Sequence, residues 1–377
     1  MKKLVISAAA LSLSPLAVAN DSDWLALDED IQALSASVQG LEGTGINIGG
    51  RVRAFYNISE DINAIGDPQT TGSGVPDLGG FSINNARLYA FGTTTQNIGY
   101  RIEVDFADRT GVFGDANLLD AYLDLPFGGE ITARVGQFRA QVLRESLIDS
   151  GNLFFADRSL PALLFAGRSQ GLSVMGNFDA LQWAVTAQNG GDGLGDDLFY
   201  AIRAQLDLAG EGTDLIEGAY GASEEMEASI AAAYFDDGNA SDADGVAIEG
   251  SLATSQFSAQ AVLLVTGEDV GFGNSGNVDT NEFYGGGLTV LPSLSDATPW
   301  AIGGTFMLTQ AGSDYGAWEV GARFQNLDDD QDTTILDVGV NYYADGHNMK
   351  YIFNWTNLDS DGPVDGDILR IGVQTRF

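Results

Sequence analysis

The chain contains no cysteine and a single histidine, His347, among its 377 residues. Without cysteine, no disulfide can stabilise the fold and no thiolate can act as a nucleophile. A Ser–His catalytic pair would depend on His347, which lies in a short Asp-Gly-His-Asn turn, and one histidine cannot form a nitrogen-ligated metal site. These absences argue against an enzyme, and no cofactor is expected.

Basic residues are also scarce. The chain has 17 Lys and Arg against 53 Asp and Glu, which gives a formal net charge of −36. Proteins that bind nucleic acid neutralise its phosphates with Lys and Arg. The charge balance therefore argues against nucleic acid as a partner, and it makes the positions of the few basic residues informative.

Long apolar runs are missing after the N-terminus, so no transmembrane helix is predicted. The one apolar stretch, Leu4–Leu13, follows Lys2 and Lys3 and precedes Ala17-Val18-Ala19. A basic start, an apolar segment and an A-x-A site are typical of a secretory signal peptide. We therefore expect residues 1–19 to direct export and to be removed.

A short helical segment is predicted over residues 20–44. Its apolar residues alternate spacings of four and three, which is the period of a coiled-coil seam: Leu27, Ile31, Leu34, Val38 and Leu41. Two heptads are marginal alone in water, so such a helix needs other copies of the chain. The alternative is one amphipathic helix lying on the main domain.

From residue 46 onward the pattern changes to alternation of apolar and polar residues. The alternating segments are about nine to twelve residues long, longer than most strands of soluble sheets. Aromatic residues lie near strand ends on the apolar face, as an interfacial girdle requires: Tyr56, Trp183, Trp318, Tyr342, Tyr351, Trp355 and Phe377. A soluble sandwich would alternate too, but these features favour an all-β transmembrane antiparallel barrel over residues 45–377.

Short and long connections alternate between the predicted strands, as in outer-membrane barrels with short periplasmic turns and long external loops. With both ends on the periplasmic side the strand number is even, and we predict about sixteen strands. A strand between Asn281 and Gly316 is doubtful, and Gly210–Met226 is longer than a periplasmic turn should be. The terminal Phe377 resembles the assembly signal of outer-membrane barrels.

The strand pattern stops between Arg139 and Arg168. This long segment is rich in apolar residues that need a dry environment, which argues for a folded functional loop. We interpret 139–168 as the third external loop, folded inward, with four arginines at a constriction: Arg139, Arg144, Arg158 and Arg168. The alternative is a packed surface loop whose arginines pair only with Glu145, Asp149 and Asp157.

The polar faces of the predicted strands place most other basic residues inside the barrel: Arg51, Arg53, Arg87, Arg101, Arg134, Arg203, Arg323, Lys350, Arg370 and Arg376. Clustered positive charge favours anions in a pore, and guanidinium suits phosphate or carboxylate. Acidic residues such as Glu103, Asp120 and Glu319 share this face. A paired wall network with weak selectivity, or a preference for cations, therefore remains open.

Several short motifs occur in order along the chain. They are GQF at 136–138, FADRSLP at 155–161, RSQG at 168–171, QNG at 188–190, TGE at 266–268, GAWE at 316–319 with Ala322-Arg323, and VGVNYY at 338–343. They resemble the phosphate-selective porin O and P family. The resemblance implies a sixteen-stranded trimeric porin with an inward third loop. Lys350 is the only lysine after residue 19, so the family name is not taken as the substrate.

These observations together predict a homotrimeric outer-membrane diffusion porin for small hydrophilic solutes, favouring small inorganic or organic anions and surrounded by lipid and lipopolysaccharide. No metal site is expected, since the acidic clusters lack EF-hand spacing: Asp236, Asp237, Asp242 and Asp244, and Asp359, Asp361, Asp365 and Asp367. A surface adhesin or a structural barrel without conductance is the remaining alternative.

Overall fold

The computed structural model describes residues 45–60, 78–107, 116–190, 197–238, 242–268, 270, 294–310, 313, 316–361 and 365–377. The predicted signal peptide and the predicted helix over 20–44 lie outside the described residues. Among the described residues, no helix is long and apolar enough to cross a membrane.

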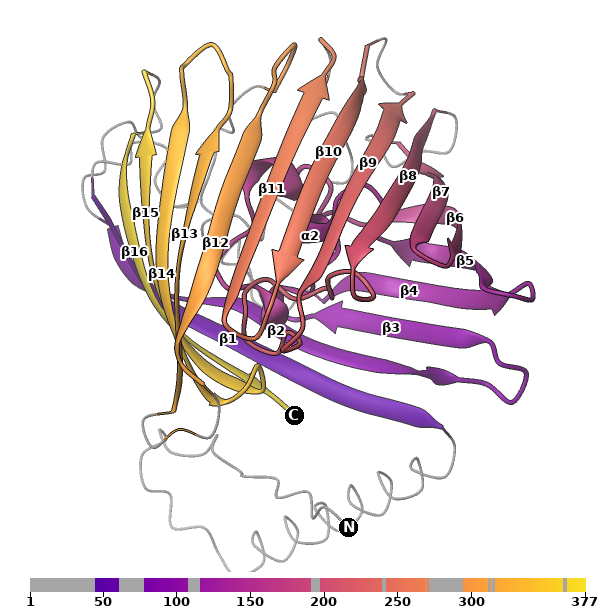
Figure 1. Ribbon diagram of the computed structural model, residues 1–377, viewed down its shortest axis with the longest axis horizontal. Coiled ribbons are helices and arrows are strands. Elements are labelled where there is room, and N and C mark those ends of the chain that lie inside the picture. The colour runs from indigo at the N-terminus through magenta and orange to yellow at the C-terminus, as the bar shows by residue number, and fades with distance from the viewer. Residues whose placement is uncertain are drawn as a thin grey trace, which may run out of the picture.

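Sixteen strands of the described part of the chain form one closed barrel (Figure 1). Each strand pairs antiparallel with its neighbours in sequence, and β1 pairs with β16. The strands are β1 Ile46–Glu60, β2 Leu78–Thr93, β3 Gly99–Asp105, β4 Asn117–Pro126, β5 Ile131–Phe138, β6 Ser169–Phe178, β7 Leu181–Asn189, β8 Leu198–Ala209, β9 Glu227–Asp237, β10 Asp244–Ala253, β11 Phe257–Thr266, β12 Trp300–Thr309, β13 Ala317–Asn326, β14 Thr334–Asp345, β15 Met349–Asp359 and β16 Gly366–Arg376.

The predicted all-β, sixteen-stranded antiparallel barrel is therefore confirmed. In the described part of the doubtful region between Asn281 and Gly316, the chain forms strand β12. Closure leaves no free strand edge, so every strand finds backbone partners on both sides. At the seam, the backbone N–H of Gly50 donates to the carbonyl of Phe377 at 2.9 Å, which ties the last residue to β1.

Tight turns join the strands at one end of the barrel. The turn between β2 and β3 is closed by a hydrogen bond from the Asn97 N–H to the Thr94 carbonyl, 2.9 Å long. Asn97 and Asp179 adopt positive φ angles of 60° and 51°, a conformation that short polar side chains tolerate in turns. The connection at this end between β8 and β9, residues 210–226, is much longer than these turns.

The burial pattern is the inverse of that of a water-soluble protein. On β8, Ile202 is 57% exposed on the outside, while its neighbour Arg203 is buried inside. The same alternation runs round the barrel, with large apolar residues exposed outward and Arg51, Arg87 and Arg323 buried. Soluble proteins rarely bury so much charge or expose so continuous an apolar surface. The outer wall is thus suited to lipid.

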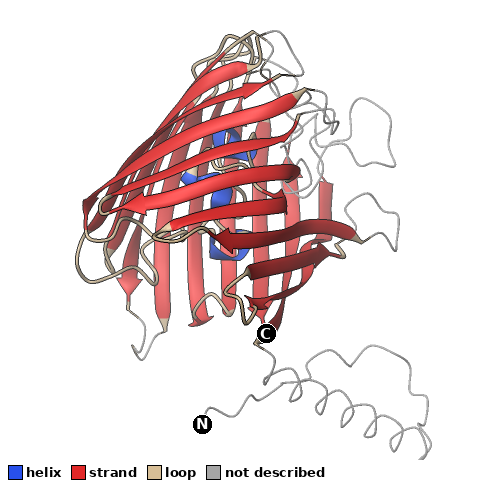
Figure 2. Cartoon of the chain, turned by 90° about the vertical axis from the view of Figure 1, so that its right-hand side faces the viewer, coloured by secondary structure: helices blue, strands red, loops and turns tan. Residues whose placement is uncertain are grey.

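The segment between β5 and β6 lies inside the barrel, as Figure 2 shows for its short helices. These are α2 Arg144–Leu147, the 3₁₀ turn η1 Ser150–Asn152 and α3 Leu160–Leu163. The Asp149 carboxylate accepts the Gly151 N–H and begins η1, and Ser159 with Pro161 in the first turn begins α3. These caps stabilise two short helical turns within the loop.

The outer wall yields a test at the middle of β10. Ile248 points outward and is 45% exposed. Replacing it with arginine in a lipid-facing wall costs about 2–4 kcal/mol at the midplane, and we expect poor barrel assembly, measured by heat-resistant mobility after folding into vesicles. The matched variant Ile248→Ala should assemble normally. Normal assembly of Ile248→Arg would contradict a lipid-facing position, because at a water-exposed site the substitution is nearly neutral.

Candidate permeation pathway

The apolar residues of loop 139–168 pack against one side of the barrel interior. The Phe165 ring lies edge-on to Phe235 of β9, with 4.8 Å between ring centroids. The inner faces of β8–β12 and β14–β16 carry small or apolar residues opposite the loop: Phe199, Ala201, Ala233, Phe235, Ala247, Leu264, Ala301, Ile335, Leu358 and Ile368. The dry environment that the loop needs is therefore a patch of the inner wall.

A pair of glycines lets the loop approach the wall closely. Gly321 of β13 and Gly339 of β14 are directly opposite in the register. A Cβ atom added to either would lie 2.7 Å or 2.8 Å from the Phe154 ring. Any side chain at these positions would push Phe154 away, so the glycines define where the loop sits.

Buried charges hold the loop in place. Arg323 of β13 donates to Glu145 at 3.0 Å, to the Asp157 carbonyl at 3.0 Å and to Asp337 of β14 at 3.0 Å. Arg370 pairs with the Asp157 carboxylate, and Lys350 donates to the Leu153 carbonyl. Removing one partner of such a buried pair costs about 3–5 kcal/mol, because the other charge is left uncompensated.

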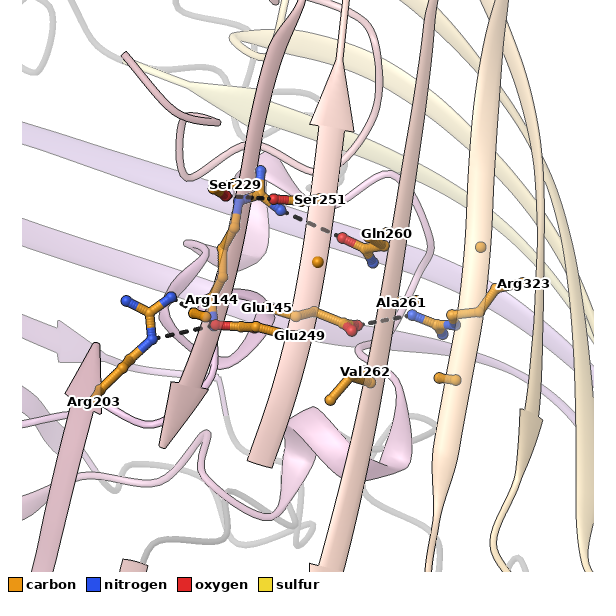
Figure 3. A pocket seen from close by; sticks show the side chains of 14 residues that line it. Arg144, Glu145, Arg203, Ser229, Glu249, Ser251, Gln260, Ala261, Val262 and Arg323 are labelled. Carbon is orange, nitrogen blue, oxygen red and sulfur yellow. Dashed lines mark hydrogen bonds and ion pairs between the residues drawn. The ribbon is translucent and has the colours of Figure 1, made fainter. Parts of the chain in front are cut away.

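The start of the loop is fixed by a second polar cluster (Figure 3). The Arg144 backbone N–H donates to Glu249 of β10 at 2.7 Å, and Arg203 of β8 pairs with the same carboxylate at 2.6 Å. The Arg144 side chain reaches Gln260 of β11. The void left among these side chains is only about 20 Å³, so the cluster is a packed contact.

The long connection 210–226 enters the interior from the end with the tight turns and meets the loop. The Glu217 carboxylate accepts the Phe154 N–H at 2.8 Å, and the Glu217 N–H donates to the Asn152 carbonyl at 3.0 Å. Arg144 donates to the Ile216 carbonyl at 2.6 Å. Tyr220 stacks on Tyr343 of β14 at 4.0 Å between centroids. The excess length noted in the sequence thus forms a second inserted segment.

The two insertions leave an open cavity of about 600 Å³ along the opposite wall. It extends from the β5 and β6 ends of the loop to Arg376 at the end of β16. Its lining comes from β1–β6, the last residue of β16 and the inserted segments: Arg51, Tyr89, Phe91, Arg101, Asp120, Tyr122, Arg134, Phe138, Arg139, Gln141, Leu147, Asp149, Asn152, Arg168, Met175, Leu215 and Arg376.

Positive charge dominates the lining of this cavity. Six arginines line it, against two carboxylates, Asp120 and Asp149. Asp149 is one-third exposed and pairs with Arg51 and Arg376. Enclosure within the barrel alone would raise the pKa of Asp149, but these two guanidinium groups hold it well below its usual range. The carboxylate therefore stays ionised, and the surrounding positive charge still exceeds it.

The basic residues predicted from sequence fall into two groups. Six line the cavity: Arg51, Arg101, Arg134, Arg139, Arg168 and Arg376. The others lie in buried contacts away from it: Arg53, Arg87, Arg144, Arg158, Arg203, Arg323, Lys350 and Arg370. Arg158, predicted at the constriction, donates instead to the Glu145 carbonyl within the loop at 3.2 Å. Arg87 pairs with Asp105 at 2.7 Å in the wall, as the alternative of a paired network predicts.

Sequence reasoning missed two features of the interior. The first is the insertion of 210–226, whose only signal was its length. The second is the set of aromatic side chains facing the cavity from β2, β4 and β5: Tyr89, Phe91, Tyr122 and Phe138. Tyr89 and Phe91 lie two and four residues after Arg87, Tyr122 lies two after Asp120, and Phe138 lies four after Arg134. Since every second residue of a strand faces the same side, this spacing could have placed the rings inside. Within the described ranges, no group of three or more His, Cys, Asp or Glu side chains is arranged to hold a metal ion.

A closed barrel of sixteen strands, with an apolar outside and a charged open space inside, defines a channel-type β-barrel. The sequence model of phosphate-selective porin O and P matches residues 46–377. The chain belongs to that family, and it is a porin. The predicted family is thus confirmed.

Solved structures of porins share the fold. A mutant of the Rh. blastica porin is 14% identical, with a TM-score of 0.53 over 88% of this chain and 100% of that one. The high-pH structure of Pseudomonas putida OprB is 10% identical, with a TM-score of 0.58 over 91% of this chain and 97% of that one. No curated protein matches the chain in sequence.

The junction of the two insertions predicts a pH dependence. Burial, and then the charge of Glu145, raise the pKa of Glu217 to about 7. Because Glu217 holds its proton more tightly in the docked state, its contribution to stability is fully present below its unperturbed pKa of about 4.3 and is lost as the pH rises through about 7. In detergent, we expect the melting temperature of the parent protein to fall as the pH rises through this range, and the Glu217→Gln variant to lose this decrease.

His347 has the opposite effect on the pH dependence of stability. Burial, and then the charges of Lys350 and Arg376, hold the pKa of His347 well below its usual value, so its contribution to stability is lost as the pH falls. The parent protein and the Glu217→Gln variant share this contribution of His347, so it cancels when their melting temperatures are compared at each pH. Glu224→Gln, at an exposed position in the same connection, serves as the control and should retain the full slope. Identical slopes in the parent and Glu217→Gln proteins would show that Glu217 is not the titrating group.

Proposed function

We propose that this protein is an outer-membrane porin through which small hydrophilic solutes diffuse, with a preference for small inorganic or organic anions such as phosphate. The mechanism is diffusion down a gradient through the cavity beside the inserted loop. It involves no catalysis and no cofactor. The observation that carries the proposal is the charge of the cavity lining, with six arginines against two aspartates.

The anion preference follows from elementary electrostatics. The barrel interior has a lower effective dielectric constant than bulk water, so fixed charges act strongly on a passing ion. Arg101 and Arg134 remain partly exposed, with side chains 25% and 21% accessible, although each pairs with a carboxylate. A lining of this kind lowers the barrier for anions and raises it for cations. The overall charge of −36 does not describe the path itself.

Loop 139–168 is proposed to set the size limit of the pore. Arg139 and Arg168, at its two ends, border the cavity and support this role. Arg144 and Arg158 are proposed to act indirectly, by holding the loop in place, since both are buried in contacts of the inserted segments. Deleting residues 157–168 is then a severe change, because it removes much of the packed interior.

The cellular setting is proposed from the wall and the sequence. The apolar exterior supports insertion into a lipid bilayer, with lipopolysaccharide as the outer-leaflet partner. Residues 1–19 are proposed as the export signal, 20–44 as a coiled-coil helix and Phe377 as the assembly signal. A homotrimer is proposed from the family resemblance, and conductance that closes in three steps would support it.

Reversal-potential recording in a planar bilayer tests the ion preference. Under a potassium chloride gradient we expect the current to reverse toward the chloride equilibrium potential. Arg376→Gln removes one positive charge from the cavity, where Arg376 lies 20% exposed, and should shift the reversal toward potassium. Glu224→Gln, outside the cavity lining, should shift it little.

Two other results would overturn parts of the proposal. Reversal toward potassium in the unmodified protein would mean that the acidic loops dominate selectivity. A folded protein without any conductance would favour a structural or adhesive barrel.

A further inference from the structure

The cavity wall formed by β2, β3 and β4 carries an aromatic ring on each side of an arginine. In the register, Phe91 of β2 is opposite Arg101 of β3, and Arg101 is opposite Tyr122 of β4. All three residues line the cavity, and Phe91 is 40% exposed. A ring, a guanidinium and a second ring therefore follow one another across three neighbouring strands.

Two guanidinium groups lie against rings in this region. The Cζ atom of Arg134 is 3.8 Å from the Tyr122 ring centroid, and that of Arg101 is 5.0 Å from the Tyr89 ring centroid. Cation–π contacts of this kind hold each guanidinium plane in a fixed orientation. The Tyr89 and Phe91 rings lie next to each other, with centroids 6.1 Å apart. The surface is thus preorganised before any solute arrives.

The pairing of these arginines leaves donors available. Arg134 uses Nε and Nη2 for Asp124, at 2.8 and 2.9 Å. Arg101 uses Nε and Nη2 for Glu103, and its Nε lies 3.5 Å from Asp120. Among the described residues, the Nη1 atom of neither arginine has a hydrogen-bond partner. The neighbouring carboxylates, by contrast, are engaged by arginines.

We propose that this surface is a binding site for planar, ring-bearing carboxylates, the class represented by benzoate. The carboxylate accepts hydrogen bonds from Nη1 of Arg101 and Arg134, while the ring of the solute stacks against Phe91 or Tyr122. The inference rests on the proposed function, since it requires anions to enter the cavity. The inference goes beyond the proposed anion preference because it names the class of anion that this wall binds most tightly.

Physical chemistry favours this class over two others. A sugar needs acceptors as well as donors for its hydroxyl groups, and the carboxylates of this wall are already paired. Inorganic phosphate would use the donors but gain nothing from the rings. A planar carboxylate uses both, and an aromatic pair adds about fivefold in affinity beyond the area it buries.

The test compares three carboxylates of the same charge on the unmodified protein in a planar bilayer. Benzoate, cyclohexanecarboxylate and acetate are added to potassium chloride, and the concentration that halves the chloride current is measured for each. We expect benzoate to act at a concentration about fivefold lower than cyclohexanecarboxylate, whose ring is not planar, with acetate weakest. Calorimetry on the detergent-solubilised protein measures the same binding without relying on conductance.

Two variants then locate the site. Phe91→Leu removes a ring that holds no guanidinium, so it should weaken benzoate binding and leave acetate unchanged. The double variant Phe91→Leu/Tyr122→Leu removes both rings and should bind benzoate about fivefold more weakly than the parent protein. Phe178→Leu is the matched control, because Phe178 is 59% exposed on the outer wall. It should bind benzoate like the parent protein.

The outcomes separate this inference from the proposed function. Chloride preference with equal affinity for benzoate and cyclohexanecarboxylate would overturn the site and leave the anion pore standing. Benzoate binding that survives both ring variants would also overturn it. Reversal toward potassium would instead remove the anion pore, and calorimetry would still decide whether benzoate binds at the rings.

Discussion

The guanidinium group of Arg323 is the contact on which the interior of this barrel depends. It joins Asp337 in the wall to Glu145 and the Asp157 carbonyl in the inserted loop. It also lies 3.6 Å from Glu217 of the second insertion and 4.5 Å from the Phe155 ring. A flat, permanently charged group with donors on several edges can satisfy all of these at once. Lysine could not reach the same set, because its three donors share one nitrogen, whereas Arg323 uses three separate nitrogens for these partners.

The inserted segments make the interior asymmetric. They fill the side formed by β8–β16 and leave an open cavity along β1–β6. Most arginines that line the cavity come from β1–β6 and the ends of the loop, but Arg53 and Arg87 of these strands are buried in contacts, and Arg376 of β16 lines the cavity. Residues of the same type on the same face of neighbouring strands therefore have different roles. Arg203 holds the loop through Glu249, whereas Arg134 faces the cavity.

Alternation of apolar and polar residues predicted the barrel and the face of each strand on which most arginines lie, and the requirement for an even number of strands gave sixteen. It could not predict which arginines face open space, because that depends on the side to which the loop docks. Docking depends on Ala201, Ala233 and the Gly321–Gly339 pair, and small residues carry almost no signal in a period-2 pattern. The role of 210–226 was hidden likewise, since its partners Thr305 and Glu319 are far away in sequence.

The partners of the loop also dictate an order of assembly. Its buried contacts with Arg323, Lys350 and Arg370 span 166, 197 and 213 residues of chain, and all three come from the last four strands. Contacts this distant form late, after the long intervening chain has been closed. Until β13–β16 are in place, Glu145 lacks Arg323 and Asp157 lacks Arg370. Phe154 also lacks the Gly321–Gly339 wall on which it packs. The loop therefore takes its final position only when the last strands have joined the barrel.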